Sequence, residues 1–151
     1  EINGSDWSSD VCSSDLKRVN FLEETFALLK LEDITAIHGR AEEFAKNKVY
    51  REQYDLCVSR AVSNLATLSE YCLPYVKGGG HFISYKSGTV QEELQQAEKA
   101  VKILGGKIQD VVYFNLPDSE IQRSLVVIEK IKTTPGRYPR KAGTPLKEPL
   151  A

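Results

Sequence analysis

Apolar residues follow two alternating spacings from Lys17 onward, and this alternation limits the possible fold more than any other feature. Stretches with apolar residues three and four positions apart, typical of amphipathic helices, alternate with short apolar runs typical of buried strands. Helices are expected over residues 18–31, 41–53, 65–74 and 89–104, and strands over 34–38, 54–59, 81–86, 108–116 and 124–132. Two strands in succession close this alternating order, which predicts an α/β doubly wound sheet with an antiparallel edge at its C-terminal end.

The composition is that of an ordinary globular domain. Of 151 residues, 41% are hydrophobic and 27% charged, which is too apolar for disorder and sufficient for one core. No apolar run approaches the ~20 residues of a membrane helix, so no membrane partner is expected. The cysteines Cys12, Cys57 and Cys72 lack the spacing of a zinc ribbon or a disulfide framework. We therefore expect a monomeric cytoplasmic domain without a metal.

The first sixteen residues differ from the rest. Residues 1–16 hold five serines, four acids and no bases, without helical or strand periodicity. The string SDWSSDVCSSDL resembles translated sequencing-adapter sequence at the ends of metagenomic gene fragments. We expect residues 1–16 to be a non-native or disordered leader. The chain has no methionine and begins at Glu1, which indicates a truncated or processed chain.

The other end of the chain is basic. Residues 130–151 contain six bases and one acid, and four prolines follow residue 133, so residues 133–151 are expected to form a tail beyond the domain of residues 17–132. Tyr138 lies among Arg137, Arg140 and Lys141, a pattern that suits the phosphates and bases of RNA. A solvated basic end is the alternative, and a non-enzymatic RNA-binding module is a second hypothesis for the chain.

Charged residues follow three of the expected strands. Glu42 comes shortly after residues 34–38, and Arg60 directly follows residues 54–59. Lys86 is the last residue of 81–86. Open α/β sheets bind ligands at the carboxyl ends of their strands, so we expect these side chains to line one crevice. Glu42 could accept a hydrogen bond from adenine or ribose, and the two cations suit a carboxylate or phosphate. Solvated surface charge is the alternative for each residue taken alone.

Several strings resemble one known family. They are KRVNFLEE (residues 17–24), HGRAEEF (38–44), YDLCVSRAV (54–62), EYCLPYVKGGG (70–80), LGGKI (104–108), RSLVVIEKIKTTP (123–135) and YPRKAGTP (138–145). They are similar to the RsmG family, the bacterial small-subunit ribosomal RNA methyltransferase G, also called glucose-inhibited division protein B. The resemblance runs from Lys17 to the C-terminus.

The resemblance implies a Rossmann-like class I fold that uses S-adenosylmethionine (SAM) to methylate N7 of a guanine in 16S rRNA within the small ribosomal subunit. It carries cofactor-binding roles onto Ala41, Glu42 and Arg60, and catalytic roles near cofactor and RNA onto Lys86 and Arg123. Guanine N7 carries a lone pair and no proton, so attack on the methyl group needs no general base. The absence of a nucleophile motif or a metal cluster from the sequence is consistent with this chemistry.

The chain also departs from the family pattern. Family members carry a glycine-rich loop after their first strand and an acidic residue at the end of the second strand, and the loop is missing here. Ser13 stands at the position where the family has its acidic residue, and Asp15 lies two residues further along the chain. We therefore assign no ribose-binding role to Asp15. We therefore expect an incomplete fold, lacking its first strand and helix and exposing apolar surface.

Overall fold

The protein is described here by a computed structural model, which covers residues 9–13, 15–60 and 63–150. The elements in chain order are β1 (Ser9–Ser13), α1 (Leu16–Leu29), β2 (Ile34–His38), α2 (Ala41–Phe44), β3 (Tyr54–Ser59), α3 (Leu65–Cys72), the 3-10 helix η1 (Leu73–Tyr75), β4 (Val76–Ser87), α4 (Gln91–Ile103), β5 (Gly106–Asn115), β6 (Gln122–Lys130) and α5 (Thr144–Lys147). The predicted bounds of β2 and β3 are confirmed to the residue.

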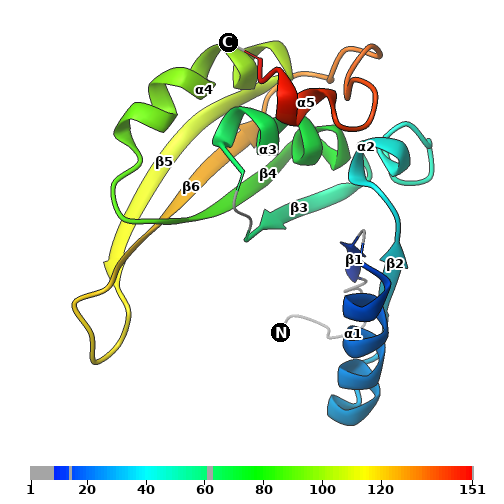
Figure 1. Cartoon of the computed structure of the whole chain (residues 1–151). Coiled ribbons are helices and arrows are strands. Elements are labelled where there is room, and N and C mark those ends of the chain that lie inside the picture. Colours follow the sequence, from blue (N-terminus) through cyan, green and yellow to red (C-terminus); the bar gives the residue numbers. More distant parts are fainter. Residues whose placement is uncertain (1–8, 14, 61–62, 151) are drawn as a thin grey trace.

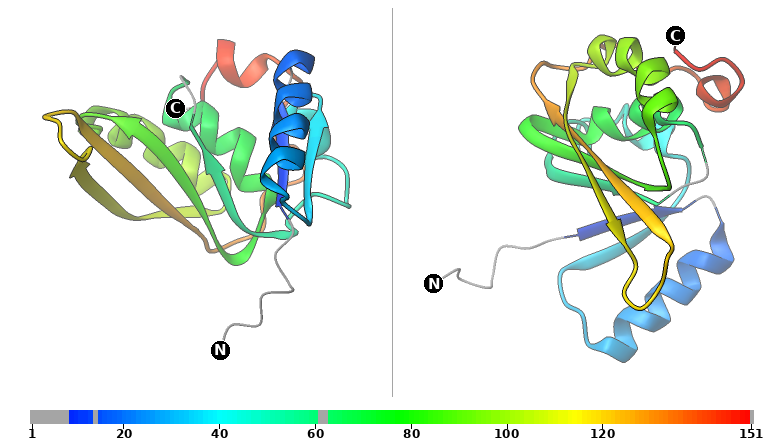
Figure 2. Two further views of the ribbon diagram at one scale, coloured as in Figure 1. Left: turned by 90° about the horizontal axis from the view of Figure 1, so that it is seen from below. Right: turned by 90° about the vertical axis from the view of Figure 1, so that its left-hand side faces the viewer.

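The strands form two separate sheets. β1 and β2 pair in parallel as one sheet, and the other has the order β3-β4-β6-β5. β3 and β4 are parallel, whereas β6 is antiparallel to both β4 and β5, which confirms the predicted antiparallel edge. The expectation of one continuous sheet was wrong for the described residues, because no ladder joins β1 or β2 to the larger sheet. In Figures 1 and 2 the β1–α1–β2 unit accordingly projects from the rest of the molecule.

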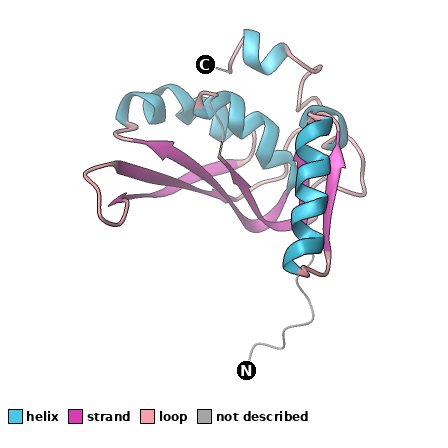
Figure 3. Ribbon diagram, turned by 60° about the horizontal axis from the view of Figure 1, so that its bottom comes forward, coloured by secondary structure: helices cyan, strands magenta, loops and turns pink. Residues whose placement is uncertain are grey.

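Helices cover one face of the four-stranded sheet, as Figure 3 shows. α3 and α4 pack on this face, where alternate residues of β4 and β6 point inward. Phe82, Val126 and Ile128 are fully buried there, together with Leu65 and Val101 from the two helices. The core of the protein therefore lies between this single helical layer and the sheet.

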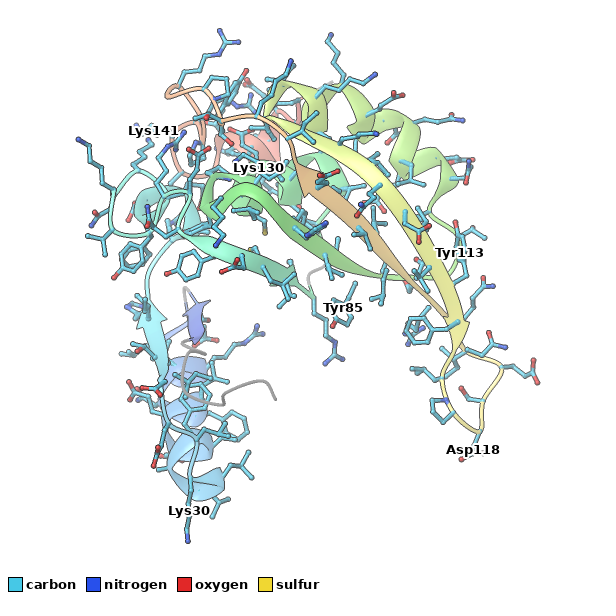
Figure 4. The ribbon with its side chains drawn as sticks, turned by 180° about the vertical axis from the view of Figure 1, so that it is seen from behind. Lys30, Tyr85, Tyr113, Asp118, Lys130 and Lys141 are labelled. Carbon is cyan, nitrogen blue, oxygen red and sulfur yellow. The ribbon has the colours of Figure 1, made fainter. Side chains whose placement is uncertain are left out.

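The opposite face of the same sheet is open and apolar. Leu56 and Val58 on β3 are 51% and 56% exposed, and Tyr85 on β4 is 45% exposed. Ladder pairing places Val58 beside Ile83 and Tyr85 beside Leu125, so these side chains are neighbours on one face. Figure 4 shows Tyr85 on this side of the sheet. The expected exposure of apolar surface is thus confirmed, since parallel strands are normally covered on both faces.

Two local expectations need correction. The helix expected over residues 41–53 ends at Phe44, because the Asn47 side chain accepts a hydrogen bond from the Val49 backbone N–H at 3.0 Å, forming a turn. Within residues 1–16, for which no regular element was expected, Ser9–Ser13 forms β1 because it finds a parallel partner in β2. Residues 1–8 lie outside the described residues, and the expectation that the leader is non-native stays a prediction.

The open face gives a matched pair of substitutions. Val58→Lys is expected to change the free energy of unfolding by less than about 1 kcal/mol, because the side chain already lies in solvent. Val126→Lys places an unpaired charge in the core and is expected to cost about 4 kcal/mol or more. Urea denaturation followed by circular dichroism measures both, and an apolar dye should bind less to Val58→Lys than to the parent. Equal destabilisation by the two lysines would contradict the assignment of an open face.

Candidate functional site

The carboxyl edge of the β3–β4 pair is the candidate site. Parallel pairing runs to Ser59↔Ser84, so Arg60 after β3 and Lys86 near the end of β4 emerge at the same edge of the sheet. Arg60 is exposed. An exposed guanidinium at this position can receive a carboxylate or a phosphate through paired N–H donors.

The amine of Lys86 is held inside this edge. Its Nζ lies 2.6 Å from Glu93 Oε1 on α4 and donates to the Ser63 carbonyl at 2.8 Å. The side chain is only 9% exposed. The same Glu93 oxygen accepts the Leu65 backbone N–H at 2.5 Å. The amine thus has two protein partners and is directed at the loop that leads into α3.

Arg123 lies at the same edge but on the other face. It pairs with Ser87 in the ladder, whereas Lys86 pairs with Ser124. Neighbouring residues of a strand point to opposite faces, so Arg123 lies on the open face and Lys86 on the helical face. One guanidinium nitrogen of Arg123 donates to the Gln122 carbonyl at 3.1 Å. The two predicted catalytic residues are therefore close along the sheet but separated by it.

Ala41 and Glu42 lie elsewhere. Glu42 is 6% exposed, and its Oε1 accepts the Gly143 backbone N–H at 3.0 Å, while the Ala41 carbonyl accepts the Tyr75 hydroxyl at 2.6 Å. Tyr75 follows the C-terminal end of α3, whereas Lys86 contacts the residues that begin it. The length of α3, about 12 Å, thus separates the two groups. The expected single crevice of Glu42, Arg60 and Lys86 was wrong for this structure, because β2 does not join the sheet that contains β3 and β4.

The C-terminal segment packs on the domain. Tyr138 is 7% exposed, so its expected stacking on RNA bases was wrong for this structure. The Arg140 guanidinium binds both carboxylate oxygens of Glu70, which is fully buried in α3, at 2.8 to 3.1 Å. This carboxylate raises the pKa of Arg140. Thr67 also donates from its hydroxyl to the Pro145 carbonyl at 2.9 Å. The segment is therefore part of the folded domain.

Arg51 and Lys130 fix the start of this segment. Arg51 donates to the carbonyls of Thr134 and Tyr138 at 2.8 and 2.9 Å. Lys130 Nζ is fully buried and lies 3.0 Å from Glu52 Oε1, with the Thr134 hydroxyl at 2.8 Å. Burial lowers the pKa of Lys130, and the hydrogen bond to Glu52 opposes that shift.

Sequence reasoning missed Glu93, Glu70 and Arg51, because each reads as an ordinary surface charge of a helix or loop. An acid on the helix after β4, facing a lysine at the end of that strand, was the available signal for Glu93.

No cluster of three or more His, Cys, Asp or Glu able to hold a metal occurs among the described residues. Within the same residues, no helix is long and apolar enough to cross a membrane.

Comparison with known sequences gives one consistent family. The family model described as rRNA small subunit methyltransferase G matches residues 1–126. The Ribosomal RNA small subunit methyltransferase G of Lachnoclostridium phytofermentans is 55% identical over 134 residues, and that of Clostridium novyi is 53% identical. Each match covers 89% of this chain and 55% of the relative, so the chain spans about half the length of these relatives.

Solved structures with the same fold are more distant in sequence. A putative transferase from Pyrococcus horikoshii matches with a TM-score of 0.64 at 14% identity, covering 83% of this chain and 49% of that one. An rRNA methylase from Streptococcus thermophilus matches with a TM-score of 0.59 at 14% identity, covering 83% and 74%. These matches confirm the predicted Rossmann-like methyltransferase fold.

The pair between Arg140 and Glu70 gives a test of the packed C-terminal segment. Arg140→Ala leaves a fully buried carboxylate without its cation, so we expect a loss of about 3–5 kcal/mol in the free energy of unfolding. Arg137→Ala is the matched control, because Arg137 is exposed and lies 5.1 Å from the centre of the Tyr138 ring, a contact of about 1 kcal/mol at most. Chemical denaturation measures both variants. Equal stability of the two would show that the segment does not pack in this way.

Proposed function

Because the chain belongs to the rRNA small subunit methyltransferase G family, we propose that the protein transfers the methyl group of SAM to N7 of a guanine in 16S rRNA. The observation that carries the proposal is the family match over residues 1–126, supported by 55% identity to a curated relative. The solved structure of M. jannaschii TYW2, which has a similar fold with a TM-score of 0.58 at 13% identity, is a complex with AdoMet, and this supports SAM as the methyl donor. The proposed setting is the cytoplasm, with the small ribosomal subunit as partner and the protein acting as a monomer.

The chemistry places few demands on side chains. Guanine N7 offers a lone pair directly, and SAM supplies an activated methyl group. The protein then has to align the two reactants and balance their charges. Among the described residues, the exposed Arg60 is suited to an anionic group, and Arg123 supplies a second cation at the same sheet edge. We propose that Arg60 contacts the cofactor and that Arg123 lies near the RNA.

The described residues fit SAM only in part. The buried carboxylate of Glu42 already holds the Gly143 N–H, so it is not presented to an adenine or a ribose in this arrangement. Ala41 and Glu42 also lie apart from Arg60, so the cofactor roles of these two residues stay predictions, and we propose a cofactor contact for Arg60. From Lys17 onward the sequence has no glycine-rich loop between a strand and a helix that could hold the methionine end.

This partial fit leads to a binding prediction. The chain of 151 residues is expected to bind SAM weakly or not at all, because only one part of the cofactor site is assembled. Isothermal titration calorimetry with SAM measures this directly. Binding in the micromolar range would show that the chain forms a complete cofactor site without a glycine-rich loop.

The activity itself is tested on the intact gene product that contains this sequence. We expect it to transfer a labelled methyl group from SAM to 16S rRNA, with the modified base located by borohydride and aniline cleavage at N7-methylguanine. Arg60→Ala should lower kcat/KM by about tenfold or more, as expected for loss of one hydrogen bond to a charged group. Lys48→Ala is the control, because this exposed lysine lies in the turn that precedes β3, at the opposite end of that strand.

Two results would reject the proposal. One is the absence of a glycine-rich loop after a strand in the genomic sequence upstream of Lys17. The other is an intact gene product that binds SAM but methylates a site other than guanine N7 of 16S rRNA.

A further inference from the structure

Six basic residues lie in the last part of the chain, and the structure divides them into two groups. Residues 130–151 contain these six bases and one acid, Glu148. Lys130 is fully buried, and the Arg140 guanidinium is paired with the buried Glu70. The other four side chains are exposed, and none of them is ion-paired with a carboxylate among the described residues: Lys132, Arg137, Lys141 and Lys147.

Arg137 and Lys141 lie in a loop that is held at both ends. Arg51 donates to backbone carbonyls on either side of Arg137, at 2.8 and 2.9 Å. Two residues after Lys141, a backbone N–H donates to Glu42 at 3.0 Å. Between these contacts, the Arg140 guanidinium binds both oxygens of a buried carboxylate. The two exposed cations are therefore carried on a backbone whose path is already fixed.

The spacing of Arg137 and Lys141 suits one strand of a nucleic acid. Four residues separate them, so their Cα atoms lie at most about 14 Å apart. A strand of duplex DNA advances about 3.4 Å per phosphate, so a few nucleotides span this distance. A loop that is held before binding also loses little conformational entropy when a ligand is bound.

This loop lies at the opposite end of β6 from the candidate site. β6 begins at Gln122, next to Arg123, and ends at Lys130, where the chain leads into the loop. The seven residues from Arg123 to Lys130 correspond to about 24 Å of extended strand. In Figure 4, Asp118 in the turn before β6 and Lys141 accordingly lie at opposite ends of the four-stranded sheet. An anion that contacts the protein at both ends is therefore a polymer.

We propose that the four exposed cations of residues 132–147 form a second RNA-binding surface, at which Arg137 and Lys141 contact phosphates of the rRNA at a distance from the guanine that is methylated. This inference rests on the proposed function, which makes rRNA the polyanionic partner. The internal pairs of Lys130 and Arg140 fix the loop, and the exposed cations bind the RNA.

The test compares two double variants of the 151-residue chain that lose the same charge. Arg137→Gln with Lys141→Gln removes two cations of the surface, whereas Lys30→Gln with Lys99→Gln removes two exposed cations from α1 and α4. Binding to a 16S rRNA transcript is measured by filter binding between about 50 and 200 mM salt.

The first double variant is expected to bind at least about tenfold more weakly than the parent, because two charged hydrogen bonds are lost. The slope of the logarithm of the binding constant against the logarithm of salt concentration should fall by about 1.4 to 1.8, since each phosphate contact contributes about 0.7 to 0.9. The second double variant should bind as the parent does. An unchanged slope, equal weakening in both variants, or a parent chain without affinity for the transcript would overturn the surface.

Two further measurements separate this surface from the alternatives. In the intact gene product, Arg137→Gln with Lys141→Gln should raise KM for the RNA about tenfold with kcat unchanged, because a remote surface binds the ground state and the transition state alike. Equal affinity of the parent chain for poly-glutamate would overturn the choice of RNA over an acidic protein. An intact gene product that methylates no rRNA would overturn the proposed function, while the salt dependence of binding would still test the surface.

Discussion

The buried amine of Lys130 is the interaction on which the rest of the larger sheet depends. It donates to the carbonyls of Leu73 and Val76 at 2.6 and 3.1 Å and lies 3.0 Å from Glu52. These partners come from the end of α3, the start of β4 and the turn before β3. Burial of an ammonium group costs free energy unless each of its N–H groups donates a hydrogen bond. Lys130, the last residue of β6, therefore holds these segments in one arrangement. The Thr134 hydroxyl completes the set and directs the chain onto the helical face.

The division of the strands into two sheets decides what the site can contain. β3 and β4 carry their carboxyl ends to one edge, where Arg60 is exposed and Lys86 is held by Glu93. Because β2 lies in the other sheet, Glu42 does not reach this edge and is instead bonded to Gly143. The same division leaves one edge of β3 without a partner strand among the described residues, next to the open apolar face of the larger sheet.

Local sequence patterns predicted most of the elements, because the apolar spacing of a helix or strand depends on neighbouring residues alone. The bounds of β2 and β3 and the apolar face of α4 follow from such patterns. The packing of the C-terminal segment could not be predicted in this way. It depends on Glu70 and Arg51, whose partners lie 70 to 87 residues away in the chain. The ion pair between Lys86 and Glu93 was missed for a similar reason, because Glu93 lies on a different element. Only the geometry of the helix distinguishes Glu93 from its neighbour Glu92.

The bonds of Arg51 join segments of the chain that the ribosome makes at different times. Its guanidinium has one local partner, the Ala45 carbonyl at 3.1 Å, and its other carbonyl partners lie 83 to 87 residues further along the chain. A ribosome that adds about 5–20 residues per second needs roughly 4–17 s to synthesise that interval. During this time the Arg51 guanidinium has only its local partner, the Ala45 carbonyl. Residues 134–138 therefore complete the contacts of a turn that was synthesised 83 to 87 residues earlier.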